Sequence, residues 1–428
     1  MKNNTHKNFV GQPTFKQVIN LLPKGLFQEL VFKLGTDRYY KTFFSYEQLV
    51  TMLFGIFARC DSMAEVCDGM RALGGKLNSL GFDIAPAKST VGDALRSRSE
   101  ELFRQYYFAL ITHFSSDLSV SRNKNGKKDI NFEKFYAFDS TVISLFTDIM
   151  KGVGYSAKGD GKKKGGLKVH MLTDIHADSP KFVNISEAVQ HDINFLSLLS
   201  FPAGSMIVFD RAYYHFLQYA HWTEAGVNFV GRLRKDTKYK VQKVVFNKKL
   251  KDGEHGVFKV EHIHISFIEE VEVKLPLVKC GYMNQKKTLC LRLVHYRDER
   301  GGTYRFITNN WDISAEEVAL CYKYRWTIET TFKKLKQNFQ LTYFYSETEN
   351  GIKTQIWCTL IAYLLLQVVK IRSESNKAFS TIAALIRMHL ISYLSLFWIV
   401  TEGRTAYPKS EHRRNKSPTT IQLLLPFM

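Results

Sequence analysis

Residues 134–234 form a succession of strand-like apolar runs, and two of these runs carry an acid. Asp139 lies in the middle of KFYAFDSTVISLF, and Asp210 ends the run SMIVFD. A buried carboxylate without a partner is costly, so such acids need cations nearby. A helical segment, HDINFLSLLS, separates strand-like runs, and this order favours a mixed α/β sheet. The sequence therefore predicts an α/β core in which Asp139 and Asp210 have a function.

A third acid lies in a segment with helical spacing, CYKYRWTIETTFKKLK, at positions 321–336. Tyr322, Arg325, Glu329 and Lys336 follow one another at steps of three, four and seven residues. At about 100° per residue, a helix would place these four side chains in a stripe about 60° wide. One carboxylate would then lie among two cations and a phenol. This pattern indicates a metal-binding acid flanked by groups that hold phosphate.

Each acid taken alone has a simpler structural interpretation. Asp139 could close a local turn, Asp210 could cap the helix that follows it, and Glu329 could pair with Lys333 one helical turn away. Together the three acids suit one site, because carboxylates on neighbouring strands repel each other unless cations bind between them. Two Mg²⁺ ions about 4 Å apart, held by carboxylates, are the arrangement that drives in-line displacement at phosphorus.

Helical regions are predicted on both sides of this core. Apolar residues recur at helical spacing over 14–116, and again from 350 onward. The apolar stretch 356–369 is too short to span a membrane and is interpreted as a buried helix. Between 236 and 304 the sequence changes to short β-like runs, which indicate a β-rich insertion. The predicted regions are a helical N-terminal DNA-binding region (1–125), a catalytic core (131–235 plus 305–345), the insertion (236–304) and a helical C-terminal region with a basic tail (346–428).

The net charge of +20 over 428 residues favours a polyanionic partner, and nucleic acid is the expected one. A short helix after Ser89 or Thr90 carries Arg96 and Arg98 and could enter a DNA groove, although a solvated surface helix explains it equally well. The six cysteines are scattered, which predicts free thiols and no zinc site. The N-terminus carries no apolar run, so a cytoplasmic protein without a membrane anchor is expected.

With these residues in place, the chain resembles bacterial insertion-sequence transposases of the DDE class. It is similar to the group typified by insertion sequence four, whose signature is Tyr-x2-Arg-x3-Glu-x6-Lys. Tyr322, Arg325, Glu329 and Lys336 match this spacing without a gap, Asp139 in FDST matches the first acid, and Asp210 in FDRAY matches the second. Two further segments, KGGLKVHMLTDI and FITNN, are similar to sequences typical of that family. The resemblance therefore spans roughly 134–340.

The resemblance implies an RNase H-like fold with a β-rich insertion and cut-and-paste chemistry at inverted-repeat ends. Asp139, Asp210 and Glu329 would ligate two Mg²⁺ ions, for which Mn²⁺ could substitute. Tyr322, Arg325 and Lys336 would grip DNA phosphates, Arg325 as a two-pronged donor. The DNA ends would be paired by a homodimer in a synaptic complex.

Several further residues are weaker candidates. Arg232 and Arg234 could follow the DNA backbone or simply be solvated, and His191-Asp192 is expected to cap a helix rather than act as a base. Trp311 and Trp326 are expected to pack in the core rather than stack on a flipped base. A glycine-bearing loop beside the first acid is expected to contact phosphate through five lysines: Lys158, Lys162, Lys163, Lys164 and Lys168.

Two other functions remain open at this level. An RNase H-like structure-specific nuclease would use the same acids, but it would not need the Tyr-Arg-Glu-Lys set or the long insertion. A catalytically inactive DNA-binding protein derived from a transposase would keep the fold and the positive charge. DNA cleavage that depends on the three acids would separate transposition from the inactive alternative.

Overall fold

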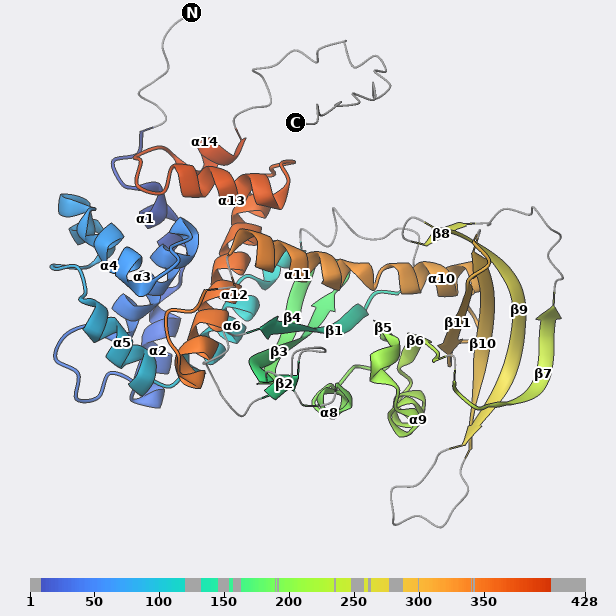
Figure 1. Cartoon of the computed structure of the whole chain (residues 1–428). Coiled ribbons are helices and arrows are strands. Elements are labelled where there is room, and N and C mark those ends of the chain that lie inside the picture. Colours follow the sequence, from blue (N-terminus) through green and yellow to red (C-terminus); the bar gives the residue numbers. More distant parts are fainter. Residues whose placement is uncertain are drawn as a thin grey trace, which may run out of the picture.

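A computed structural model describes residues 9–401 of the chain, apart from 120–131, 145–153, 157–162, 248–257, 277–287 and short gaps at 189, 191, 235, 261–262, 299, 340 and 342. A helical body at one end adjoins a long mixed sheet that continues to the other end (Figure 1). The α/β class and the helical flanks that the sequence predicts are therefore confirmed.

The sheet has eleven strands, and its main path runs in the order β2-β3-β1-β5-β6-β11-β10-β9-β7, with β4 paired to β3 and β8 to β9. In its first half, β1 is antiparallel to β3 and parallel to β5, and β5 is parallel to β6. The strands are β1 (Phe135–Ser144), β2 (Gly154–Ser156), β3 (Lys163–Asp174), β4 (Ser179–Glu187), β5 (Met206–Phe209), β6 (Asn228–Arg232), β7 (Lys240–Asn247), β8 (Phe258–Val260), β9 (Ile263–Pro276), β10 (Thr288–Asp298) and β11 (Thr303–Thr308).

Helices cover both faces of the sheet next to β1 and β5, with α10 and α11 above it and α8 and α9 below it in Figure 1. The described helices are α1 (Thr14–Ile19), α2 (Lys24–Leu34), α3 (Ser45–Ala58), α4 (Met63–Arg71), η2 (Gly74–Leu80), α5 (Lys88–Ser97), α6 (Glu101–His113), α8 (Ile193–Leu196), η3 (Arg211–Tyr213), α9 (Phe216–Glu224), α10 (Ala315–Lys323), α11 (Trp326–Asn338), α12 (Glu349–Arg372), α13 (Phe379–Met388) and α14 (Leu396–Thr401).

Helix α12 joins the helical body to the sheet. It is apolar on all sides, as a fully buried helix must be, and it packs against α3, α6 and α11. Two of its polar side chains bond to neighbouring segments: the Trp357 indole donates to Glu100 at 2.6 Å, and the Gln367 amide donates to the Asp178 carbonyl at 2.6 Å. Among the described residues it is the one helix long and apolar enough to cross a membrane, and 94% of its most apolar window is buried within the protein. The predicted buried helix is confirmed.

The first and last described segments are held together. Phe9 forms a β-bridge with Leu394, and the Thr14 hydroxyl and the Gln17 amide both donate to the Leu394 carbonyl, at 3.0 and 2.8 Å. The N-terminal helices and the C-terminal helices thus form one helical body around α12.

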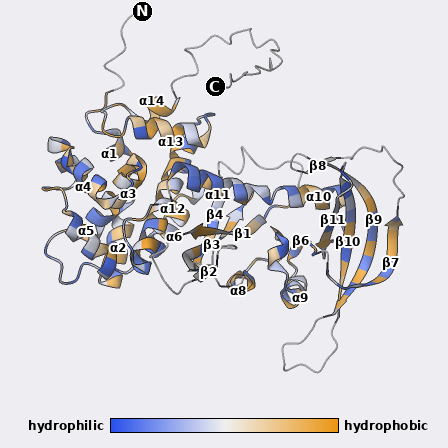
Figure 2. Ribbon diagram, viewed as in Figure 1, coloured by the Kyte–Doolittle hydropathy of each residue, from blue (hydrophilic) through white to orange (hydrophobic). Residues whose placement is uncertain are grey.

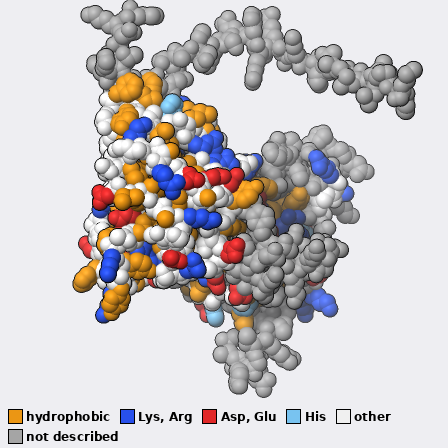
Figure 3. All heavy atoms as spheres, turned by 60° about the vertical axis from the view of Figure 1, so that its left-hand side comes forward, with side chains coloured by type: hydrophobic (Ala, Val, Ile, Leu, Met, Phe, Trp, Pro, Cys, Tyr) orange, Lys and Arg blue, Asp and Glu red, His pale blue; other side chains and the backbone are white. Residues whose placement is uncertain are grey.

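Of the two arginines that the sequence assigned to one short helix, Arg96 lies in α5 and Arg98 is the extended residue that follows it. Arg98 is buried, and its guanidinium donates to Gln48 at 3.0 Å and to the Phe43 carbonyl. Arg96 is exposed and pairs with Asp93 at 2.8 Å. On the face toward the N-terminal helices, basic side chains lie scattered among acidic and hydrophobic ones (Figure 3). Arg98 therefore stabilises the helical body, and the groove-reading role considered for it is wrong.

The strands of the predicted insertion are continuous with the rest of the sheet. β10 pairs with β11, and β11 pairs with β6, so β9 and β10 extend the sheet that begins with β1. Hydrophobic and hydrophilic residues alternate along β9 and β10 (Figure 2), which fits strands whose two faces differ in burial. This continuity allows residues of the insertion to contact the helices above the sheet.

Candidate active site

Strand β1 places Asp139 on one face of the sheet and Ser140 on the other, since side chains alternate along a strand. We call the face that α11 covers the front face and the face that α8 covers the back face. The front face carries Asp139 and Thr141, and the back face carries Ser140 and Val142. Asp139 is largely buried, with 17% of its side chain exposed. It belongs to a ten-residue strand and does not close a turn.

Asp210 lies next to Asp139 because of the strand register. β5 runs parallel to β1 with Phe138 opposite Phe209, so the residue after each of these is an acid at the same edge of the pair. Asp210 precedes η3, but its carboxylate makes no capping bond to the described residues. On the other side, β6 approaches Phe209 so closely that a Cβ added at Gly231 would lie 2.5 Å from the Phe209 ring. Glycine at this position allows the strand to pack beneath the second acid.

Tyr322 reaches Asp210 from α10. Its hydroxyl donates to the Asp210 carboxylate at 3.3 Å, and its ring stacks on Phe306 with the centroids 4.5 Å apart. Burial raises the pKa of Tyr322 to about 12, and Arg325 opposes the shift. The phenol therefore stays protonated at neutral pH and acts as a hydrogen-bond donor to the second acid.

Arg325 joins the first and third acids. One terminal nitrogen of its guanidinium lies 2.6 Å from the Glu329 carboxylate and 3.2 Å from the Asp139 carboxylate. Burial favours the neutral form of Arg325, but Tyr322, Glu329 and Asp139 outweigh burial, and the pKa of the guanidinium is raised. Glu329 therefore bonds to Arg325, and the pairing with Lys333 considered from the sequence does not account for it.

The helical stripe spans two helices rather than one. Tyr322 lies in α10, whereas Glu329 and Lys336 lie in α11, and the chain between the helices is tightened by bonds from the Arg325 amide to Tyr322 and from the Ile328 amide to Arg325. Despite this junction, Tyr322, Arg325 and Lys336 all bond to residues of β1 or to Asp210 at the end of β5, and Glu329 is joined to them through Arg325. Lys336 donates to the Thr141 hydroxyl at 2.6 Å and to the Val142 carbonyl at 3.3 Å, and burial lowers its pKa.

The front face holds more negative than positive charge around Asp139. Burial raises the pKa of Asp139 to about 7, Arg325 and the Ser140 amide oppose this shift, and Asp210 and Glu329 add to it. Within the described residues no three His, Cys, Asp or Glu side chains are grouped closely enough to hold a metal ion. The Arg325 guanidinium instead bridges Asp139 and Glu329. In this arrangement a cation of the protein joins the first and third acids, and a phenol bonds to the second.

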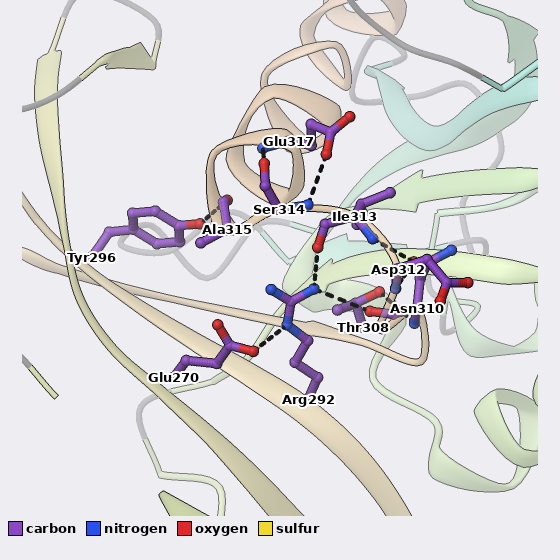
Figure 4. A network of polar contacts seen from close by, with 10 residues as sticks. All are labelled: Glu270, Arg292, Tyr296, Thr308, Asn310, Asp312, Ile313, Ser314, Ala315 and Glu317. Carbon is purple, nitrogen blue, oxygen red and sulfur yellow. Dashed lines mark hydrogen bonds and ion pairs between the residues drawn. The ribbon is translucent and has the colours of Figure 1, made fainter. Parts of the chain in front are cut away.

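The start of α10 is fixed by a polar network that the sequence did not reveal (Figure 4). Arg292 of β10 is buried, pairs with Glu270 of β9 at 2.8 Å, and donates to the Ile313 carbonyl at 2.5 Å. Asn310 accepts the backbone amides of Asp312 and Ile313 at 2.9 and 3.1 Å.

Two further contacts complete the attachment of α10. Ser314 and Glu317 form a capping box, and Tyr296 of β10 donates to the Ala315 carbonyl. The insertion thus orients α10, and with it Tyr322. The one signal in the sequence was Arg292, a charged residue within the apolar run CLRLV.

The basic loop beside the first acid is only partly within the described residues. Lys158 and Lys162 lie outside them, and Lys163 and Lys164 belong to β3 rather than to a loop. Lys168 is 9% exposed, and its ammonium group donates to the Gln190 carbonyl at 2.8 Å and lies 3.4 Å from Asp192. Because these internal contacts occupy Lys168, we do not retain it as a DNA contact.

The remaining candidates occupy different surroundings. Arg232 lies over the Tyr304 ring at 4.8 Å, and Arg234 donates to the Arg211 carbonyl at 3.2 Å. Arg234 is exposed and lines an open cavity of about 510 Å³ that also includes Asp210. Trp311 and Trp326 are 46% and 39% exposed, so the expectation that both pack in the core is wrong.

Comparisons with known proteins identify the family of this part of the chain. Residues 130–365 match the family model described as "Transposase DDE domain", and residues 10–83 match a domain of unknown function, DUF4372. The protein y4zB of Sinorhizobium fredii, named as a transposase, is 26% identical over 67% of this chain and 72% of its own. A probable transposase for insertion sequence element IS5377 of Geobacillus stearothermophilus is 25% identical over 64% of this chain and 68% of its own.

Among solved structures, the piggyBac transposase synaptic complex with hairpin DNA aligns at a TM-score of 0.43 and 12% identity, over 94% of this chain and 84% of that one. That overlap is below the level at which a shared fold can be inferred. The family model, in contrast, covers more than half of the 428 residues, including Asp139, Asp210 and Glu329. The chain belongs to the DDE-domain transposase family and is a DNA transposase.

Proposed function

We propose that this transposase cuts and rejoins DNA at the inverted-repeat ends of an insertion sequence, with Asp139, Asp210 and Glu329 as its catalytic acids. The observation that carries this proposal is their convergence. The acids are 71 and 119 residues apart in the chain, and yet Arg325 contacts the first and third while Tyr322 contacts the second.

The donor set fits divalent cations of the Mg²⁺ type. All three acids offer carboxylate oxygens, which hard cations prefer. Asp139 is a carboxyl whose pKa is raised to about 7 because burial and two neighbouring acids outweigh Arg325. An added cation would relieve that imbalance. The chemistry that two bound Mg²⁺ ions supply is activation of the attacking oxygen and stabilisation of the leaving one.

The protein's own part is to position the acids and to hold DNA phosphates. Arg325 would exchange its bonds to Asp139 and Glu329 for a phosphate, which its planar fork suits. Lys336, which is exposed, and Arg232 would bind phosphates beside it. Tyr322 would keep Asp210 oriented and extend its hydroxyl contacts to the same DNA strand.

Other features support the wider proposal. The order β4-β3-β1-β5-β6, with the first three strands antiparallel and the last two parallel to β1, is consistent with an RNase H-like core. The charge of +20 suits DNA as the partner. We further propose that a homodimer pairs two DNA ends, that the N-terminal helices contribute to end binding, and that the protein acts in the bacterial cytoplasm.

The test is cleavage of a duplex that carries the terminal repeats flanking the protein's own gene, in the presence of Mg²⁺. We expect nicking at the repeat boundary by wild type, and strand transfer when target DNA is added. Asp139→Asn, Asp210→Asn and Glu329→Gln should each bind the duplex and leave it uncut. A cut that ignores the repeats would favour a structure-specific nuclease, and binding without any cut would favour an inactive derivative.

A further inference from the structure

A second polar cluster lies on the back face of β1, directly behind the catalytic acid. The Asp192 carboxylate accepts the Ser140 hydroxyl at 2.7 Å and lies 3.4 Å from the Lys168 ammonium group. Lys168 also donates to the Gln190 carbonyl at 2.8 Å, which ties the segment before α8 to β3. The sequence predicted that Asp192 caps a helix. It occupies the N-cap position of α8, but its carboxylate makes no capping bond to the described residues.

His170 closes the cluster on its buried side. Its ring stacks on Phe195 with the centroids 4.8 Å apart, and one ring nitrogen is 2.9 Å from the Ser186 hydroxyl. The other ring nitrogen is 3.8 Å from Asp192. Burial lowers the pKa of His170 to about 4, and Asp192 opposes the shift. The imidazole is therefore neutral near pH 7, and Lys168 is the charged partner of Asp192.

Ser140 links the cluster to the front face. Ser140 directs its hydroxyl backward to Asp192, while its backbone amide donates forward to the Asp139 carboxylate at 2.8 Å. The bond on the back face therefore restrains the peptide whose N–H orients the catalytic acid. A carboxylate held within about 0.5 Å of its working position is what a preorganised site requires.

We propose that Asp192 is a positioning residue for DNA cleavage, which acts through Ser140 to hold Asp139 in place. The inference rests on the proposed role of Asp139 as a catalytic acid. Asp192 itself neither contacts DNA nor binds the reacting atoms. Its carboxylate keeps the Ser140 hydroxyl on the back face, and the ion pair with Lys168 anchors that carboxylate to β3.

The experiment is a double-mutant cycle on pre-bound DNA ends, measured as the single-turnover cleavage rate with saturating Mg²⁺. We expect Asp192→Asn and Ser140→Ala each to slow cleavage roughly 10- to 100-fold, the usual cost of removing a partner that orients a metal-binding group. The double variant should be no slower than the slower single variant, because both changes break the same link. Ser140→Thr keeps a hydroxyl and should restore most of the rate.

The matched control is Asp117→Asn. Asp117 is similarly buried, with 17% of its side chain exposed against 22% for Asp192, and it forms a double hydrogen bond with Arg372 away from the site. Its loss should lower the melting temperature at least as much as Asp192→Asn and leave the cleavage rate unchanged. This control separates positioning from general stability.

A second readout does not depend on cleavage. Tb³⁺ added to DNA-free protein should luminesce when the tyrosines and tryptophans of the protein are excited, since Tyr322 and Trp326 lie beside the site. The Tb³⁺ concentration at half signal should rise in Asp192→Asn and Ser140→Ala. Wild-type rates and Tb³⁺ affinity in both variants, or rate losses that multiply in the double variant, would overturn the inference. Wild type that binds Tb³⁺ but cuts no DNA would instead refute the proposed function.

Discussion

The two faces of β1 differ in how their charges are balanced. On the back face one acid, Asp192, has one buried cation, Lys168, and a hydroxyl donor. On the front face Arg325 is the guanidinium that serves two acids, Asp139 and Glu329, while Asp210 adjoins them with a phenol donor.

The difference shows which face is complete by itself. On the back face the Asp192 carboxylate finds both its cation and its hydroxyl donor within the protein, so we assign this cluster a supporting role. The front face concentrates carboxylates beyond what its own cations neutralise, and a buried charge without enough compensation is costly. Cations and DNA phosphates bound at the front face would offset that cost. The following predictions test this contrast, beginning with the largest effect.

The first prediction concerns the acids of the front face. Asp139→Asn should reduce the rate of end cleavage by roughly 1,000-fold or more. The carboxylate would hold a cation that stabilises the transition state by several kcal/mol. The same variant should melt at a higher temperature than wild type in chelator, because an amide is cheaper to bury than a carboxylate. Cleavage gels and thermal melts measure the two effects. A variant that loses stability and keeps its activity would reverse the assignment.

The second prediction concerns the geometry of the central cation. Arg325→Lys keeps the charge but not the planar fork that reaches Asp139 and Glu329 together. We expect cleavage to fall on the order of a hundredfold, about 3 kcal/mol. Lys323→Arg, on the exposed end of α10, serves as the control and should cut at the wild-type rate. Equal rates for Arg325→Lys and wild type would show that charge alone suffices.

The third prediction concerns phosphate binding. Lys336→Ala should weaken end binding several-fold and reduce the slope of log affinity against log salt by about 1, as expected for one lost phosphate contact. Lys333→Ala, on the same helix and also exposed, is the matched control. Titrations at several salt concentrations measure the slope. If both variants change the salt slope equally, then Lys336 does not bind a DNA phosphate in a way that Lys333 does not.

The fourth prediction uses the opposite pKa shifts of the two faces. The pKa of Asp139 is raised to about 7, so the folded protein binds a proton at Asp139 more readily than the unfolded chain does. Above pH 7 the buried carboxylate therefore lowers the free energy of unfolding of wild type. Acidification from pH 7.5 toward 5 should shrink the stability difference between Asp139→Asn and wild type. The pKa of His170 is lowered to about 4, so below about pH 6.5 the unfolded chain binds a proton at His170 that the folded protein does not. Acidification should therefore destabilise wild type more than it destabilises His170→Gln. Melts in chelator should show differences on the order of a few degrees. Parallel pH curves for all three proteins would contradict both assignments.

The sequence predicted the sheet strands and the three acids because those signals are local. Apolar runs, an acid inside such a run, and a helical repeat of Tyr322, Arg325 and Glu329 can all be read within a few residues. The partners of these residues could not be read in this way. That Arg325 bonds to Asp139 depends on how α11 crosses β1, which brings together residues 186 positions apart.

Misjudged residues share a physical reason. Lys168 and Arg98 looked like surface cations, but each reaches a buried partner that a distant segment supplies. Trp311 and Trp326 are predicted to pack in the core, although both are partly exposed. The role of Arg292 could not be predicted from the sequence, because it depends on the β-rich insertion lying against the start of α10 (Figure 4).

The most direct test of the front-face account is to replace Mg²⁺ by Fe²⁺ and add ascorbate and peroxide, so that hydroxyl radicals cut the chain next to a bound metal. The account predicts cuts near positions 139, 210 and 329 in wild type, and their loss in Asp139→Asn. Cuts at other positions, or unchanged cuts in Asp139→Asn, would contradict the claim that these three acids form one metal site.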